Sequence, residues 1–330
     1  MRTQTHKIDN VFIEACFSSV GKKEAEGPLG EYFDAKYEDD MLGQKNWEMA
    51  ESTLLKNTVS GALTSASKTP DEIDMIFAGD LLNQCTASSF GLKELGIPYL
   101  GLYGACSTFA QGLAVGAMLM DGGFADCAAT AASSHFCSSQ KQYRFPLQYG
   151  EVRTPTSQWT VTGSGCTVLS REKGFARITD VTIGKMVDLG ITDANNMGAA
   201  MAPSAADTIY AHFDETGRSP DDYDLVVTGD LAWVGSDILL DLLRQKGLKL
   251  TNHSDCGKII FQKQEQNVQS GGSGCGCIAS VFSGFFAKKI KLGEINKMLL
   301  VGTGALMSPT GVLVGESIAG ISHAVAIERV

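Results

Sequence analysis

A repeated segment is the feature of this sequence that most restricts its possible folds. Residues 69–81 align with residues 219–231 at a constant offset, and the two copies share Pro, Asp, Asp, Gly, Asp and Leu at matching positions. Each copy predicts a short helical turn followed by a buried strand, at 75–78 and at 225–228, that ends in Gly-Asp. A chain that contains one unit twice is expected to fold into two related halves.

The surroundings of the two copies repeat the same order of elements. Apolar residues recur every three or four positions over 47–66, with Lys56 and Asn57 on the outer face, and this spacing predicts an amphipathic helix. A matching helix is expected around 205–213. In each half a Gly/Cys-rich turn then leads into an apolar helix and a further strand: turn 104–107, helix 108–120 and strand 126–132 in the first, turn 274–277, helix 278–288 and strand 297–303 in the second.

Strands that alternate with helices predict an α/β fold with right-handed crossovers and mainly parallel sheets. We expect two halves, 1–172 and 173–330, that pack face to face with helices between and outside them. No Pro/Ser/Gly-rich linker separates the halves. Residues 136–158 are polar and aromatic, and we expect them to form a long insertion loop that covers a site or a subunit interface. His323 falls in a strand-like segment, 320–328, and is expected to be structural.

Composition excludes several classes of function. The net charge of −10 disfavours nucleic acid as a partner, and a site for an anion would need its own local positive potential. The N-terminus does not resemble a signal peptide, and no apolar run approaches the roughly 18 residues that span a membrane. Nine cysteines without a secretory signal indicate reduced thiols rather than disulfides.

Cys106 is the first candidate for chemistry. It lies in the turn between a predicted strand and the helix that starts near Thr108. The free N–H groups and the dipole of a helix N-terminus are expected to lower the pKa of this thiol, and the same geometry suits a ligand carboxylate. The alternative is that Cys106 is a small, buried apolar residue.

At this turn the chain resembles the thiolase superfamily, which includes the ketoacyl synthases. The resemblance implies a duplicated five-layer α-β-α-β-α fold with the nucleophilic cysteine at the position of Cys106. It extends to residues 161–169, which resemble the Gly-rich strand after the insertion loop of the synthases.

Within that superfamily, the chain resembles the stage V sporulation protein AD family most closely. The segments that carry this resemblance are Gly79-Asp80-Leu81-Leu82-Asn83-Gln84, Tyr103-Gly104-Ala105-Cys106-Ser107-Thr108, Ser133-Ser134-His135, Tyr143-Arg144-Phe145-Pro146, Trp159-Thr160-Val161-Thr162-Gly163 and Val227-Thr228-Gly229-Asp230-Leu231.

That resemblance implies binding of dipicolinic acid (pyridine-2,6-dicarboxylate), with or without calcium, and a role in its uptake into the developing spore. It also implies a homodimer. The protein would be made inside the cell and associate peripherally with the spore inner membrane through other stage V sporulation membrane proteins.

The departures from the synthases concern catalysis. Condensation needs a base and an oxyanion hole, which the synthases supply as His or Asn from two loops of the second half. The corresponding loops here, 228–231 and 270–274, contain neither residue type. The sequence therefore predicts a binding protein without catalysis or cofactor. The alternatives are an acyl-transfer enzyme that uses Cys106 and a scaffold with a vestigial pocket.

The ligand is expected to contact residues from five segments. The candidates are Cys106, Ser107, Thr108, Asn83, Gln84, Ser134, His135, Gly229, Asp230, Gly272 and Ser273. The alternative for His135 is a structural role. Arg144 either pairs with a ligand carboxylate or has a surface or interface role. His253, Cys256, Cys275 and Cys277 have no familiar metal-site spacing, so we expect no metal.

Overall fold

The computed structural model describes residues 3–143 and 153–330. Its strands are β1 (Thr5–Gly21), β2 (Ala35–Tyr37), β3 (Met75–Gly79), β4 (Tyr99–Gly101), β5 (Cys127–Ser134), β6 (Trp159–Thr160), β7 (Gly163–Ser170), β8 (Ala176–Ile183), β9 (Leu225–Thr228), β10 (His253–Asp255), β11 (Gly272–Ser273), β12 (Lys297–Ala305) and β13 (Gly320–Arg329). The helices are α1 (Lys22–Ala25), α2 (Trp47–Ser65), α3 (Thr86–Leu92), α4 (Thr108–Asp121), α5 (Phe136–Tyr143), α6 (Met197–Thr216), α7 (Ala232–Gln245), α8 (Cys256–Ile259), α9 (Cys275–Val281), α10 (Ala287–Lys291) and α11 (Pro309–Leu313).

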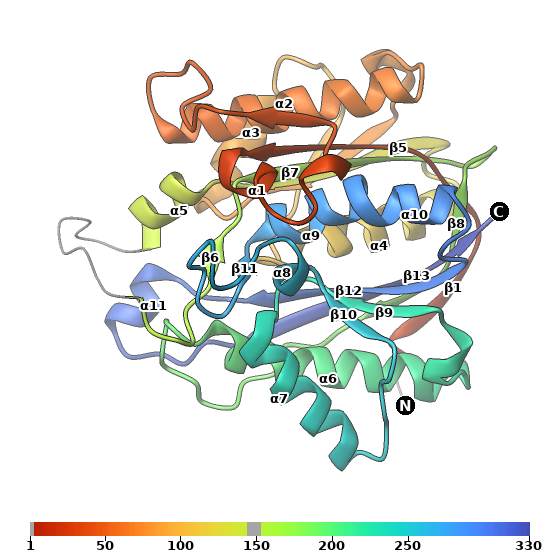
Figure 1. Cartoon of the computed structure of the whole chain (residues 1–330). Helices are drawn as coiled ribbons and strands as arrows, with labels where there is room; N and C mark the ends of the chain where they lie inside the picture. Colours follow the sequence, from red (N-terminus) through yellow and green to blue (C-terminus); the bar gives the residue numbers. More distant parts are fainter. Residues whose placement is uncertain (1–2, 144–152) are drawn as a thin grey trace.

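These elements form five layers (Figure 1). Helices α2 and α3 cover one outer face, α6 and α7 cover the opposite face, and α4, α9 and α10 lie between two sheet layers. The strand order is β10-β9-β12-β13-β8-β1-β7-β5-β3-β4. Pairing is parallel among β3, β4 and β5 and among β9, β10 and β12, as the crossovers predict, whereas β1, β7, β8 and β13 pair antiparallel with their neighbours in this order.

Strand β1 joins the two sheet layers. Its first part, from Thr5 to Ile13, pairs with β8, and its second part, from Phe12 to Val20, pairs with β7. One strand of 17 residues therefore belongs to both halves of the molecule. The hydrogen-bonded path through the two layers is continuous.

The duplication seen in the sequence is present in the structure. A 3₁₀ turn at Pro70–Glu72 precedes β3, and a 3₁₀ turn at Pro220–Asp222 precedes β9. In each turn a hydroxyl residue and an acidic residue three positions later satisfy each other's backbone N–H groups, as a capping box does. Helices α2 and α6 occupy the predicted positions before these turns.

Two elements differ from their predicted form. The expected helix at 278–288 is interrupted by a π-helical turn, Phe282–Phe286, in which a side chain at Gly284 would approach Ser18 Oγ to 2.7 Å. The expected loop at 136–158 starts with α5, and its buried Ser138 donates to Glu51 Oε2 at 2.6 Å. The part of that segment at 144–152, including Arg144, lies outside the described residues.

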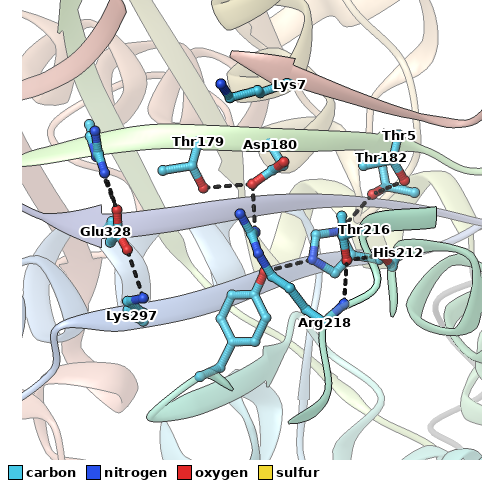
Figure 2. A network of polar contacts seen from close by, with 12 residues as sticks. Thr5, Lys7, Thr179, Asp180, Thr182, His212, Thr216, Arg218, Lys297 and Glu328 are labelled. Atoms are coloured by element: carbon cyan, nitrogen blue, oxygen red, sulfur yellow. Dashed lines mark hydrogen bonds and ion pairs between the residues drawn. The ribbon is translucent and has the colours of Figure 1, made fainter. Parts of the chain in front are cut away.

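Side-chain hydrogen bonds link α6 and the segment after it to strand β8 of the sheet (Figure 2). His212 lies 2.9 Å from Thr182 Oγ1 of β8 through Nδ1 and 2.7 Å from the Tyr223 hydroxyl through Nε2. Arg218 Nη1 donates to that hydroxyl at 2.9 Å and to Asp180 Oδ2 at 2.6 Å. Burial lowers the pKa of His212 to about 4, so the imidazole is neutral at pH 7.

Candidate functional site

Cys106 lies where the turns of the two halves meet. The sulfur is 3.7 Å from the hydroxyl oxygen of Ser273, which belongs to β11 just before α9. The side chain is buried, as is that of Ser273. Ala105 has a positive φ of 48°, so the turn before α4 is held in the left-handed region. Its carbonyl accepts from Thr108 Oγ1 at 2.6 Å and from Cys275 Sγ at 2.9 Å.

Asp230 is the ionisable group beside this turn, and it follows β9 directly. Its Oδ2 accepts from Ser273 Oγ at 2.8 Å and from Gly274 N at 2.9 Å, and its Oδ1 accepts from Thr303 Oγ1 at 2.6 Å. These donors fix the carboxyl group as an acceptor. Full burial nevertheless raises its pKa above the usual range. Asp230 thus organises the second-half turn.

The predicted lowering of the Cys106 pKa is wrong. Burial raises the pKa of this thiol well above its usual value, and the negative charge of Asp230 raises it further. Cys106 also precedes Ser107, the N-cap of α4, so it lies outside the first helical turn. The thiol form is therefore favoured.

His135 and His253 hydrogen-bond to groups other than Cys106. His135 Nε2 is 2.7 Å from the carbonyl of Asp40, and its Nδ1 accepts from Cys137 N at 3.2 Å. His253 Nε2 is 2.9 Å from Thr228 Oγ1, on the neighbouring strand. His135 is thus buried and hydrogen-bonded within the protein. Among the described residues, no hydrogen bond joins either imidazole to the Cys106 sulfur.

The remaining candidates divide into buried turn residues and exposed ones. Ser107 Oγ donates to Gly104 O at 2.6 Å, and Ser134 Oγ donates to Val161 O at 2.7 Å and accepts from Gly276 N at 3.0 Å. These hydroxyls, like that of Thr108, stabilise the turns. Gly229 and Gly272 are buried in the two second-half loops.

Asn83 and Gln84 lie on the surface instead. Both are exposed in the loop after β3, where the backbone N–H of Asn83 donates to Gln142 Oε1 at 2.9 Å. Gln84 has a positive φ of 60°. The structure therefore does not bring these two residues into the buried group around Cys106.

Sequence reasoning missed two residues near this site. Thr303 and Asp255 lie at the carboxyl ends of β12 and β10, and Asp255 accepts from the backbone N–H groups of Leu231 and Ala232 at 2.9 Å. The rule that parallel strands present their carboxyl ends at one edge would have found both.

The described part of the chain has neither a cluster of metal-binding side chains nor a membrane-spanning helix. Over residues 3–143 and 153–330, no group of three or more His, Cys, Asp or Glu side chains is arranged to hold a metal ion. No helix in the same residues has the length and apolar character needed to cross a bilayer.

Solved structures with a similar fold are thiolase-like proteins. A variant of OleA from Xanthomonas campestris aligns with a TM-score of 0.64 and 14% identity, over 99% of each chain. The 3-oxoacyl-[acyl-carrier-protein] synthase III from Aquifex aeolicus VF5 aligns with a TM-score of 0.59 and 13% identity, over 96% of this chain and 99% of its own. These similarities confirm the predicted thiolase-like fold.

Sequence comparison identifies the family. The family model for stage V sporulation protein AD matches residues 2–328. The stage V sporulation protein AD of Bacillus subtilis (strain 168) is 45% identical over 320 residues, which cover 97% of this chain and 94% of that protein. The chain belongs to the stage V sporulation protein AD family, and its role is in sporulation.

Proposed function

We propose that this protein binds dipicolinic acid without chemical turnover and serves its uptake into the developing spore. The observation that carries the proposal is the neighbourhood of Cys106. A condensing site requires a proton acceptor and oxyanion donors at this position. Here the sulfur has Ser273 and the carboxyl of Asp230 beside it.

The energetics of this neighbourhood oppose catalysis at two steps. Activation of Cys106 requires its thiolate, which burial and Asp230 both disfavour. Attack on a thioester carbonyl would then place negative charge on an oxygen close to Asp230. Like charges in a buried site repel strongly, so the transition state would be destabilised rather than stabilised.

Calcium is expected to assist binding. Dipicolinate carries two negative charges at neutral pH, and the protein carries a net charge of −10, so the long-range field opposes approach of the free dianion. One Ca²⁺ cancels both carboxylate charges of the ligand. We therefore expect the calcium chelate to associate at least as well as the free acid.

Calorimetry on the purified protein tests the proposal. Dipicolinate, with and without CaCl₂, should give a saturable binding heat, and Cys106→Ala should retain saturable binding, because binding without turnover needs no covalent bond to the sulfur. Incubation with radiolabelled acyl-CoA should leave no label on Cys106. Absence of heat under both conditions would reject dipicolinate binding, and label at Cys106 would favour the acyl-transfer alternative.

We also propose that the protein acts as a homodimer and reaches the spore inner membrane through partner proteins. The exposed edge strand β4 supports the first part, because its residues Tyr99 and Leu100 are 36% and 46% exposed at the end of the sheet.

A further inference from the structure

Two loops at one end of the molecule expose apolar side chains. The first, residues 184–196, connects β8 to α6, and the second, residues 306–319, connects β12 to β13 and includes α11 (Figure 1). We call them the paired loops. Their most exposed apolar side chains are Met186, at 71%, and Leu313, at 86%. The other exposed apolar side chains are Leu189, Val312 and Val314. Exposed apolar side chains that gather on neighbouring loops are typical of a protein interface.

Hydrogen bonds hold the paired loops together. Val187 N donates to Gly320 O at 2.9 Å, and Gly320 N donates to Val187 O at 2.8 Å. The Ser317 hydroxyl donates to Asp188 Oδ2 at 2.5 Å. Because these bonds fix the two loops relative to each other, a partner that contacts one loop is within reach of the other.

The charged side chains of the paired loops are mainly acidic. Asp188, Asp193 and Glu316 are exposed, and no cation in residues 3–143 and 153–330 forms an ion pair with any of them. Lys185 is the single Lys or Arg of the two loops, and its ammonium pairs with Asp207 of α6 at 3.7 Å. The surface therefore combines apolar contact area with negative charge.

This combination of apolar area and negative charge selects the kind of partner. A bilayer that contains anionic lipids repels the three carboxylates. A second copy that used the same loops in a symmetric contact would bring like charges together. A protein segment with Lys or Arg beside apolar side chains is complementary in both respects. Membrane proteins carry Lys- and Arg-rich segments of this kind in the short loops on one side of the bilayer.

The second of the paired loops follows the strand that packs against the Cys106 turn. That strand is β12, whose Thr303 donates to Asp230. A side chain at Gly304, also in β12, would come within 2.3 Å of the Gly104 carbonyl. A partner bound at the paired loops is therefore at the same end of the sheets as the turn that carries Cys106.

We propose that the paired loops are a docking surface for a Lys- or Arg-rich loop of a membrane protein. The exposed apolar side chains supply the contact area, and Asp188, Asp193 and Glu316 face the cations of the partner. This inference rests on the proposed function only in that the protein reaches a membrane through partners. It does not depend on the identity of the small ligand.

Site-specific photocross-linking in sporulating cells tests the docking surface. p-Benzoylphenylalanine in place of Leu189 should form an adduct with a membrane protein, and the linked peptide should contain Lys or Arg next to apolar residues. The same group in place of Phe124, which is exposed in the turn after α4, should give no such adduct. An adduct with lipid or with a second copy of the chain, or no adduct from position 189, would overturn the inference.

Matched variants separate the apolar and the charged contributions. Leu313→Glu should lower the yield of the adduct from position 189 by about tenfold, the loss typical of an apolar side chain that anchors an interface. Glu316→Lys should lower it several-fold, because a cation would then face the cations of the partner. Asp71→Lys, at an exposed position before β3, should leave the yield unchanged. Equal yields in all three variants, each shown to be folded by thermal unfolding, would contradict the assignment.

Two further measurements distinguish this inference from its alternatives. The purified wild-type chain should not sediment with vesicles of phosphatidylglycerol and phosphatidylcholine, and sedimentation that Leu313→Glu abolishes would make lipid the occupant and overturn the inference. Calorimetry with dipicolinate gives the state of the proposed ligand. An adduct from position 189 together with no dipicolinate heat would support the docking surface and reject the ligand. Dipicolinate binding without an adduct would reject the docking surface alone.

Discussion

The acidic residue beside Cys106 affects the ionisation of this thiol. Asp230 lies in the 228–231 loop, and three donors from Ser273, Gly274 and Thr303 hold its carboxyl group. A carboxylate in that role stabilises the turn between β11 and α9. It also opposes ionisation of the neighbouring sulfur.

Asp230→Asn should separate these two effects. The amide cannot accept from all three donors, so we expect the free energy of unfolding to fall by about 1–3 kcal/mol. Loss of the negative charge should lower the pKa of Cys106, and alkylation of Cys106 by iodoacetamide at pH 8 should become several-fold faster. Cys16, 8% exposed against 5% for Cys106, is the internal control, because the causes of its raised pKa do not include Asp230. An unchanged rate at Cys106, followed by mass spectrometry, would contradict this account.

Glu24 is predicted to make stability depend on pH. Its pKa is raised by burial from 4.5 to about 8, so the unfolded chain loses this proton at lower pH than the folded protein. The contribution to stability is fully present below pH 4.5 and is lost as pH rises through 8. Glu24→Gln should therefore stabilise the protein at pH 9 by about 3–5 kcal/mol relative to wild type, since each tenfold change in an acid dissociation constant corresponds to ~1.4 kcal/mol.

The comparison that checks this prediction is urea denaturation at pH 5 and pH 9. Glu26→Gln, at an exposed position two residues away, should give the wild-type difference between the two pH values. A Glu24→Gln variant with the same pH dependence as wild type would show that the carboxyl group is not titrating in this range.

At the scale of single residues, the sequence predicted which residue types lie near Cys106 but not the pKa of the Cys106 thiol. The absence of His and Asn in loops 228–231 and 270–274 was visible in the sequence, and the structure places Asp230 and Ser273 of these loops beside the thiol. The raised pKa of Cys106 was not visible, because desolvation depends on tertiary packing. Asn83 and Gln84 were grouped with the site by sequence similarity alone, which carries no information about exposure.

At the scale of elements, a network of polar side chains links α6 and the segment after it to strand β8 (Figure 2). His212, Arg218, Tyr223 and Asp180 form a chain of contacts from α6 to β8 through the Tyr223 hydroxyl. His212 and Tyr223 are buried, so removal of either leaves the other unsatisfied, whereas Arg218 is partly exposed.

Tyr223→Phe is expected to lower the free energy of unfolding by about 1–3 kcal/mol, because His212 Nε2 and Arg218 Nη1 each lose a partner. Tyr210→Phe, within α6 itself, is the control. Tyr210 is 38% exposed, and its ring contact with Lys246 survives the substitution. Equal stability of the two variants in urea would show that the network contributes little.

The order of elements was predictable, and their interruptions were not. Periodicity and the 69–81 repeat predicted α2, β3, α6 and β9 close to their observed positions. The π-helical turn at Phe282–Phe286 arises where Gly284 packs close to Ser18 of β1, a contact between residues far apart in the chain. Helix α5 was missed because its residues are mostly polar, and its position depends on the buried Glu51.

At the scale of the whole molecule, the sheet has unequal ends. β10 ends it in the second half, and β4 ends it in the first half with all three residues exposed. Phe90 and Tyr103, which flank β4 in sequence, are 62% and 43% exposed. An exposed edge strand with apolar neighbours is a template for pairing with another chain. In the proposed homodimer, the second copy pairs with β4.

Leu100→Glu tests this assembly. Leu100 is the central residue of β4, and its replacement would bring two like charges together across a symmetric strand pair, which is destabilising. We expect wild type to elute as a dimer in size-exclusion chromatography with light scattering, and Leu100→Glu to elute as a folded monomer at the same concentration. Phe124→Glu, at a side chain 70% exposed in the turn after α4, should remain dimeric. A monomeric wild type, or a dimer that persists in Leu100→Glu, would exclude β4 as the contact.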